Sequence, residues 1–299
     1  MLHNFEAVNF QAPLHLDIEI THKCTLNCKY CFNQSSSLES AEISLEIFNE
    51  IVEEAKKMSI FEICISGGEP FIHKDIMKMI SKIKNLGLGI SIVTNATLIT
   101  KKKASQLSAL DVISNMQVSF DGHNQKIHEK TRRDFNKSLK GFLNLCDQVQ
   151  DRHRAPSVGI VISKYNYMQI PNIVNFFKNY TDRLNLMAVQ KCNELELSTN
   201  QKREFETKYL PIVKDIFQQE KLRGRIIEDK DTSGFEMSRT HIDCLAGIIF
   251  LVISPELDIY PCDIVRKSLG KWEHQGSLKK AHENAKVCWS NLNCSWCQN

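Results

Sequence analysis

Residues 14–31 read LHLDIEITHKCTLNCKYC, an alternating segment followed at once by three closely spaced cysteines. Polar and apolar residues alternate over Leu14–Ile20, which is the pattern of a β-strand with two different faces. Cys24, Cys28 and Cys31 therefore lie in the loop after the carboxyl end of a predicted strand. In α/β folds that edge of the sheet carries the active site, so this loop is the first candidate for function.

The spacing of these cysteines suits an iron–sulfur cluster. Soft thiolates favour iron–sulfur clusters or zinc. Three thiolates can ligate three irons of a [4Fe-4S] cube and leave the fourth iron open, as catalysis requires, whereas a structural zinc site needs four closed ligands. His22 is the available fourth zinc ligand, but it precedes Cys24 by only two positions, so its geometry would be cramped. From these residues alone both metals stay open, with the cluster favoured.

The same pattern of strand, turn and amphipathic helix recurs along the chain. Further strands are expected at Phe61–Ser66, Gly89–Thr94, Met116–Phe120, Val158–Ile162 and Leu184–Val189. Helices are expected at Leu45–Met58, Ile76–Leu86, Lys101–Ala109, Asn136–Gln150 and Met168–Tyr180. This alternation implies right-handed crossovers and a parallel sheet. We therefore predict an α/β fold, and six units favour a partial (β/α)6 barrel over the closed eight-unit form.

Several predicted strands carry a polar residue at every second position. His15, Asp17 and Glu19 share one face of the first strand, and Gln117 and Ser119 share one face of the fourth. Parallel strands that are buried on both faces usually read as continuous apolar runs. The inner face of the barrel is therefore expected either to be wet or filled by a ligand, or to hold a few polar groups that neighbours satisfy.

The composition excludes several classes of function. The chain has 299 residues, of which 42% are hydrophobic, 24% are charged and eleven are cysteines. A net charge of +3 is too small to indicate nucleic acid or a membrane surface as a partner. No apolar run reaches the roughly 18 residues of a membrane span, and no signal peptide is evident, so a cytoplasmic protein is expected. In that compartment clustered cysteines indicate metal or catalysis before disulfides.

A second motif gives the first cluster a family. Ser66-Gly67-Gly68-Glu69-Pro70 ends the second predicted strand and matches the GGEP motif of the radical S-adenosylmethionine (SAM) superfamily. The spacing Cys24-x3-Cys28-x2-Cys31 resembles the cysteine signature of the same superfamily. The resemblance implies that Cys24, Cys28 and Cys31 hold a [4Fe-4S] cluster that binds SAM. It also implies that Glu69 and the backbone of Gly67, Gly68 and Pro70 receive the amino group of SAM. Bare glycines permit that close approach.

Weaker matches extend the resemblance over residues 14 to about 190. They comprise Tyr30 before the last cysteine, Thr94-Asn95-Ala96 in place of Thr-Asn-Gly, Ser119-Phe120-Asp121-Gly122 in place of Ser-x-Asp-Gly, and the segment His128–Arg132. The family's serine usually lies near the ribose of the cofactor, which implies this position for Ser119. An arginine after it often meets the carboxylate of the cofactor, and Arg132 or the adjacent Arg133 would take that role.

Four further cysteines lie near the C-terminus: Cys244, Cys262, Cys294 and Cys297. From spacing alone, a structural zinc site is the better interpretation. Tyr260-Pro261-Cys262 and the terminal Cys-x2-Cys, however, resemble the SPASM extension, which carries auxiliary [4Fe-4S] clusters. Leu257 departs from the usual glycine, and the chain ends two residues after Cys297, so the segment resembles the shorter twitch domain with one auxiliary cluster. Cys288 is a possible replacement for one ligand.

Three regions are expected on these grounds. Residues 1–190 form the radical SAM partial barrel, residues 191–243 form a partly helical linker with a helix near Arg203–Gln219, and residues 244–299 form a small C-terminal twitch/SPASM-like iron–sulfur domain. Two of the remaining thiols are candidates for catalysis. In some relatives a cysteine donates a hydrogen atom to a substrate radical, and Cys192, after the sixth strand, is the first candidate for this role. Cys64 is the second.

The resemblance implies reductive cleavage of SAM to a 5′-deoxyadenosyl radical, which abstracts hydrogen from a substrate. The substrate is expected to be a ribosomally made peptide (RiPP) that is crosslinked or epimerised, with an electron donor such as flavodoxin or ferredoxin as partner. The alternative is a dehydrogenase or epimerase of a small natural product such as an amino-sugar. Only 23 residues precede Cys24, too few for a leader-binding domain, so a separate leader-binding protein is expected for a peptide. A non-enzymatic zinc-binding module is the remote alternative.

Overall fold

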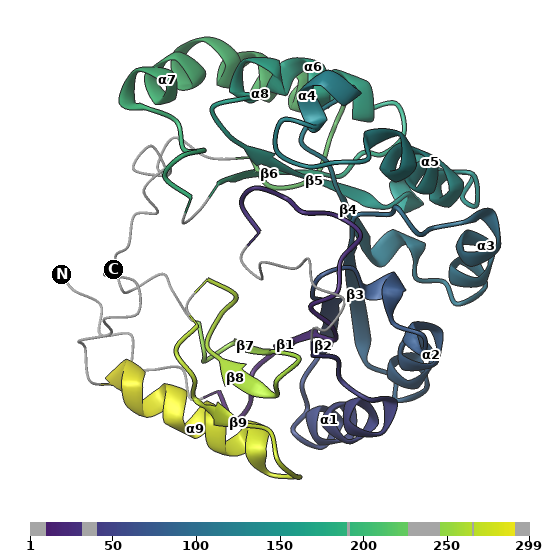
Figure 1. Ribbon diagram of the computed structural model, residues 1–299, viewed down its shortest axis with the longest axis vertical. Helices are drawn as coiled ribbons and strands as arrows, with labels where there is room; N and C mark the ends of the chain where they lie inside the picture. Colours follow the sequence, from purple (N-terminus) through teal and green to yellow (C-terminus); the bar gives the residue numbers. More distant parts are fainter. Residues whose placement is uncertain (1–9, 32–40, 190–191, 227–245, 265, 291–299) are drawn as a thin grey trace.

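A computed structural model describes residues 10–31, 41–189, 192–226, 246–264 and 266–290. For residues 287–290 it describes the backbone only. These residues form one curved sheet with helices on its outer side (Figure 1). Among them, no helix is both long enough and apolar enough to span a lipid bilayer.

The sheet has nine strands in the order β6-β5-β4-β3-β2-β1-β7-β8-β9. Strands β1 to β7 pair in parallel, and β8 and β9 are antiparallel additions at one edge. The strands are β1 His15–Glu19, β2 Glu62–Ser66, β3 Gly89–Thr94, β4 Met116–Ser119, β5 Ser157–Ile162, β6 Leu184–Ala188, β7 Phe250–Ile253, β8 Asp258–Tyr260 and β9 Gly270–Lys271. The predicted α/β fold with a mostly parallel sheet is confirmed.

Helices follow the parallel strands, and all of them except the short α4 lie in segments where the periodicity predicted a helix. They are α1 Leu45–Lys57, α2 Ile76–Asn85, α3 Lys101–Ala109, α4 Gln125–His128, α5 Phe135–Cys146 and α6 Ile170–Phe177, with short 3₁₀ turns at Pro70–Ile72, Ile113–Asn115, Arg152–Arg154 and Tyr167–Gln169. Local chemistry sets where several begin. The Ser44 hydroxyl accepts a hydrogen bond from the Ile47 amide at the start of α1, and Thr100 accepts one from Lys103 at the start of α3.

Residues 199–219, which the sequence analysis assigned to a linker, belong to the helical layer. They form α7 Thr199–Glu204, a π-helical turn at Phe205–Tyr209 and α8 Leu210–Gln219. Phe205, Val213 and Phe217 are buried in the common core. Ser198 and Gln201 form a reciprocal capping box at the start of α7. The helical layer on this sheet therefore includes α7 and α8.

The C-terminal segment joins the same sheet. β7 pairs with β1, so the strand that leads into the cysteine loop has a partner on both sides. Glu54 in α1 is buried, and its carboxylate accepts hydrogen bonds from Trp272 Nε1 (3.1 Å) and the Leu278 amide (3.0 Å). The latter lies at the start of α9 Ser277–Ser290. This buried carboxylate therefore joins the C-terminal segment to the helical layer of the barrel.

Alternation along the strands separates the two faces of the sheet. Ile18, Ile63 and Ile92 are fully buried in the apolar core under the helices. On the other face, polar side chains pair with one another. Ser66 Oγ donates to Asp17 (2.5 Å), and Asn185 Nδ2 donates to Gln117 (2.7 Å). Neighbouring side chains therefore satisfy some of the hydrogen-bonding groups on the inner face, which agrees with the second of the two expectations for this face.

A glycine in α5 sets how closely this helix approaches the loop after β3. A Cβ on Gly141 would overlap the carbonyl oxygen of Ala96. Replacing glycine by alanine inside a helix normally adds about 1 kcal/mol of stability. Here we expect Gly141→Ala to lower the free energy of unfolding by ~2 kcal/mol, because the new methyl group would overlap the Ala96 carbonyl, which is part of the backbone and cannot move aside freely.

Urea unfolding of the wild type and Gly141→Ala, at equal metal loading, measures this difference. Lys140→Ala, at the exposed neighbouring position, is the control and should stay within about 0.5 kcal/mol of the wild type. A Gly141→Ala protein as stable as the wild type would show that α5 does not touch the Ala96 carbonyl.

Candidate active site at the strand ends

Four loops meet at the carboxyl edge of the parallel sheet. The cysteine loop follows β1, the Gly67–Pro70 turn follows β2, residues 95–97 follow β3, and residues 120–124 follow β4. In Figure 1 the segment after β1 lies inside the curve of the sheet. The hydrogen bonds below join the cysteine loop to each of the other three.

The two glycines after β2 let this turn pack against the chain that enters the cysteine loop. Gly68 N donates to Thr21 O (2.7 Å), and Glu69 N donates to Lys23 O (2.8 Å). A Cβ on Gly68 would overlap the Lys23 carbonyl, and Gly67 has φ +129°, a conformation that favours glycine. The glycines therefore fix the position of the residues just before Cys24.

The carboxylate of Glu69 is fully buried and braces the loop after β3. It accepts hydrogen bonds from the Phe71 amide (3.1 Å), from Thr94 Oγ1 (2.8 Å) and from the Asn95 amide (2.8 Å). Burial raises the pKa of Glu69, and these donors oppose that rise. These bonds hold in place the side chain that is predicted to receive an amino group.

Asn95 links the loop after β3 to the cysteine loop. Its Nδ2 donates to Thr25 Oγ1 (3.1 Å) and lies 3.6 Å from Cys24 Sγ. The next residue, Ala96, has φ +60°, which explains why the similar family motif has glycine there. Ala96 is tolerated at this position, at the cost of backbone strain.

Asp121 holds the other side of the cysteine loop. Its buried carboxylate accepts hydrogen bonds from Tyr30 Oη (2.5 Å) and Thr131 Oγ1 (2.7 Å), and it lies 3.2 Å from Arg132 Nε. Burial raises the pKa of Tyr30 well above its usual value, so the phenol stays protonated and donates. Asp121 thus joins the loop after β4 to Tyr30 in the cysteine loop.

Arg132, rather than Arg133, faces the cysteines. Arg132 Nη1 lies 3.7 Å from Cys28 Sγ, and its guanidinium lies over the Tyr30 ring at 5.3 Å from the centroid. Arg133 is exposed to solvent. A cation beside Cys28 stabilises a thiolate there, in opposition to burial, which raises the pKa of Cys28.

The surroundings of the cysteines suit a cluster better than a single ion. Burial raises the pKa of Cys24 to about 11, so a metal centre would have to displace its proton. In a cubane each thiolate binds its own iron and the fourth iron stays open, whereas a structural zinc ion needs four ligands around it. Hydrogen-bond donors to sulfur, as here from Asn95 and Arg132, are a usual feature of clusters.

The remaining predicted residues fall into two groups. Ser119 ends β4, Pro70 begins the 3₁₀ turn after β2, and Cys192 Sγ lies 3.9 Å from the Lys29 carbonyl, so all three are at the strand ends. Cys64, the second candidate for catalysis, is buried in the middle of β2 opposite Asp17 and Ser91. The structure does not bring Cys64 to the edge where the cysteine loop lies.

The second cysteine group is described only at Cys262, which is buried just after β8. Cys244, Cys294 and Cys297 lie outside the described residues, as does the side chain of Cys288. Near Cys262, Leu257 has φ +67°, which accounts for the glycine that the similar SPASM motif carries at this place.

Sequence reasoning missed two residues that tie the loops together. Thr131 donates to Asp121, and Thr25 accepts from Asn95. No motif or periodicity marks either threonine.

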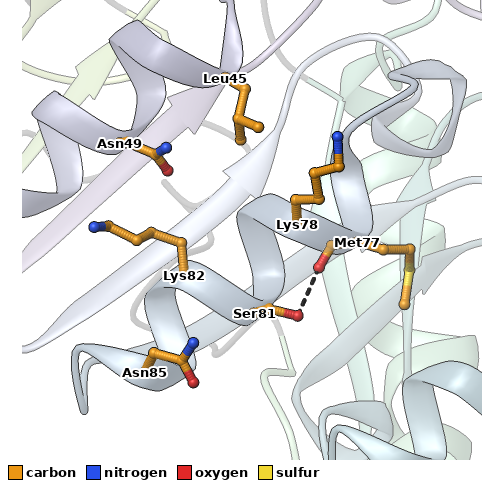
Figure 2. A pocket seen from close by; sticks show the side chains of 7 residues that line it. All are labelled: Leu45, Asn49, Met77, Lys78, Ser81, Lys82 and Asn85. Carbon is orange, nitrogen blue, oxygen red and sulfur yellow. Dashed lines mark hydrogen bonds between the residues drawn. The ribbon is translucent and has the colours of Figure 1, made fainter.

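A hollow of about 430 Å³ lies on the outer side of the sheet between α1 and α2 (Figure 2), lined by Leu45, Asn49, Met77, Lys78, Ser81, Lys82 and Asn85. It lies on the helical layer and shares no lining residue with the strand-end loops.

Comparison with known proteins agrees with this geometry. The family model described as the Radical SAM superfamily matches residues 18–177. The chain is 26% identical over 186 residues to the PqqA peptide cyclase of Bradyrhizobium diazoefficiens, covering 62% of this chain and 48% of that protein. It is 25% identical over 181 residues to the mycofactocin maturase MftC of Mycolicibacterium smegmatis, covering 60% and 45%. The chain thus spans about half the length of these relatives.

The same fold is found in a solved structure. Streptococcus suis SuiB bound to S-adenosylmethionine superposes with a TM-score of 0.70 at 19% sequence identity, covering 95% of this chain and 67% of SuiB. At that identity the likeness shows the fold alone.

Replacing Asp121 tests whether this carboxylate holds the cysteine loop. Asp121→Asn would leave Arg132 buried without its counter-charge, which typically costs about 3 kcal/mol or more. We expect a lower free energy of unfolding by that amount and less iron bound per chain after anaerobic reconstitution.

Asp134→Asn is the control, because it makes the same chemical change at a part-exposed carboxylate paired with Lys137 (3.0 Å). It should lower the free energy of unfolding by under about 1 kcal/mol and leave the iron content unchanged. Equal behaviour of the two variants would show that Asp121 does not position the loop.

Proposed function

The chain belongs to the Radical SAM superfamily, and on that premise we propose that it cleaves S-adenosylmethionine reductively to a 5′-deoxyadenosyl radical that abstracts hydrogen from a peptide substrate. The observation that carries the proposal is the joining of four strand-end loops around Cys24 and Cys28 by Glu69, Asn95 and Asp121.

A [4Fe-4S] cluster at Cys24, Cys28 and Cys31 would supply the electron that splits a carbon–sulfur bond of SAM. The protein's part is to hold the cluster and to orient SAM. Asn95 and Arg132 donate toward the sulfurs of Cys24 and Cys28, which favours the charged thiolates.

The same loops provide groups for SAM itself. The backbone of Gly67–Pro70 and the carboxylate of Glu69 are the proposed acceptors for the amino group. The hydrogen bonds that Glu69 accepts from Phe71, Thr94 and Asn95 fix the turn in place, and its two oxygens can accept a further one. Arg132 is the proposed partner of the carboxylate, since it faces the cysteines and Arg133 does not. Ser119, at the end of β4, is proposed to lie near the ribose.

A peptide substrate is supported by the relatives, which are named as a peptide cyclase and as a maturase. Because the chain spans only about half their length, the choice between crosslinking and epimerisation is left to experiment. Incubation with SAM, a reductant and a candidate precursor peptide tests the class. A crosslink lowers the mass of the peptide, whereas epimerisation inverts a residue with its mass unchanged. Conversion of amino-sugars but of no peptide would favour the small-molecule alternative.

We further propose an auxiliary [4Fe-4S] cluster bound by Cys244, Cys262, Cys294 and Cys297. The support is the buried position of Cys262 and the left-handed backbone at Leu257, where the similar motif has glycine. An anomalous diffraction scan at the iron and zinc edges would identify the metal, and zinc at Cys262 in anaerobically prepared protein would contradict this part.

Iron analysis separates the two clusters. After anaerobic reconstitution the wild type should hold about eight irons per chain, and the triple variant Cys24→Ala, Cys28→Ala, Cys31→Ala about four, with no 5′-deoxyadenosine formed. Cys146→Ala, which changes a packing residue on α5, should keep both the iron and the activity. Cleavage of SAM by the triple variant would refute the assignment of the catalytic cluster.

Cys192 is proposed to give a hydrogen atom to the substrate radical, because it lies next to the cysteine loop at the Lys29 carbonyl. Cys192→Ala should still form 5′-deoxyadenosine but should give no epimerised product, and the wild type should place solvent deuterium at the product carbon. Cys64→Ala, in the middle of a strand, serves as the matched control. If Cys192→Ala turns over like this control, Cys192 is only a packing residue and an oxidative reaction is the better account.

A further inference from the structure

Three lysines gather around one tyrosine beside the cysteine loop. The Nζ atoms of Lys29, Lys130 and Lys164 lie 5.2, 5.9 and 5.3 Å from the centroid of the Tyr165 ring. Lys29 belongs to the cysteine loop, Lys130 follows α4, and Lys164 follows β5. These four residues are referred to below as the lysine patch.

The three lysines of the patch differ from many others on the described surface in having no carboxylate within ion-pair distance. Elsewhere, lysines such as Lys78 and Lys137 pair with Asp75 and Asp134 at 2.7 and 3.0 Å. Lys29, Lys130 and Lys164 form no such ion pair within the part of the chain that the structure describes. Three like charges around one ring repel one another, and the ring face offsets this only in part. A negatively charged partner would relieve the repulsion.

The lysine patch is fixed to the backbone of the proposed cluster site. Lys29 directly follows Cys28, so their Cα atoms are about 3.8 Å apart. Lys29 N donates to Thr131 O (2.9 Å), which joins the segments that carry Lys29 and Lys130. Lys164 N donates to Leu195 O (2.9 Å), which fixes the Lys164 segment to the chain after β6. A molecule bound here would therefore sit within one residue of a proposed cluster ligand.

The surface also has an apolar centre. The Tyr165 side chain is 36% exposed, and Met168, three residues later, is 46% exposed. Lys29 and Lys130 are exposed at the rim. An apolar centre with a charged rim is the anatomy of a protein interface, and contacts between electron-transfer proteins are small.

We propose that the lysine patch is the docking surface of an acidic one-electron donor, a small flavin or iron–sulfur protein. The inference rests on the proposed function, because cleavage of SAM consumes one electron that must come from outside the chain. The donor arrives reduced, loses one electron to the cluster bound at Cys24, Cys28 and Cys31, and leaves oxidised. An acidic segment of the peptide substrate is the competing occupant, and the test below separates the two.

The test compares two reductants. In Lys130→Glu/Lys164→Glu the charge of the lysine patch is reversed, while Lys29 is kept because it adjoins Cys28. The control, Lys101→Glu/Lys102→Glu, makes the same change of charge at exposed positions on α3. Formation of 5′-deoxyadenosine is measured with dithionite and with reduced flavodoxin, at low and at high salt.

With dithionite, all three proteins should react at rates within about twofold of one another. With flavodoxin at low salt, the lysine-patch variant should be slower by about tenfold or more, since charge complementarity raises association rates by that much. The control should match the wild type. Raising the salt to 1 M should bring the wild type toward the lysine-patch variant, because the Debye length then falls to about 3 Å.

Two outcomes would overturn the inference. Equal rates with flavodoxin would show that the donor docks elsewhere. Loss of activity with dithionite as well, accompanied by a raised KM for the peptide, would assign the surface to the substrate. Should the variant fold poorly, as judged by iron content, Lys130→Gln/Lys164→Gln and direct titration with oxidised flavodoxin answer the same question. Failure of the wild type to cleave SAM with dithionite would refute the proposed function and not the docking surface alone.

Discussion

The buried carboxylate of Asp121 decides where the cysteine loop lies. A charge removed from water is tolerated only when donors and a counter-charge surround it. Here the donors come from Tyr30 in the cysteine loop and from Thr131, and the counter-charge comes from Arg132. None of these groups can move without leaving a buried charge unsatisfied. The loop after β4, the segment after α4 and the cysteine loop are therefore fixed as one unit.

Glu69 also fixes the cysteine loop, on its opposite side, and it uses its side chain and its backbone for two different contacts. Its carboxylate holds the loop after β3, while its amide holds the chain just before Cys24. The cysteines thus sit between two buried carboxylates, each of which is occupied by the protein itself. Arg132, which lies beside Cys28 Sγ, is the cation between these braces that is proposed to meet the carboxylate of SAM.

Local patterns predicted the local structure well. The strand Gly89–Thr94 and the helix Lys101–Ala109 were predicted with the bounds that the structure has, because alternation and capping are properties of neighbouring residues. The pairing of β7 with β1 could not be predicted in this way. The apolar run of β7 does not reveal its partner, since His15 and Phe250 are far apart in sequence. The helix expected near Arg203–Gln219 could be predicted from its local pattern, but its packing could not: the charged sequence of this segment does not reveal that Phe205 and Val213 are buried in the core.

The pairing of β7 with β1 has a consequence for the order of folding. During synthesis β1 is made before β2 to β6, but its second neighbour, β7, is made after all of them. Until then β1 is an edge strand whose unpaired N–H and C=O groups are open to pairing with other chains. Contacts between residues so far apart are also slow to form. The strand that leads into the cysteine loop is thus enclosed only after β7 has been made, and until then aggregation competes with the pairing of these two strands.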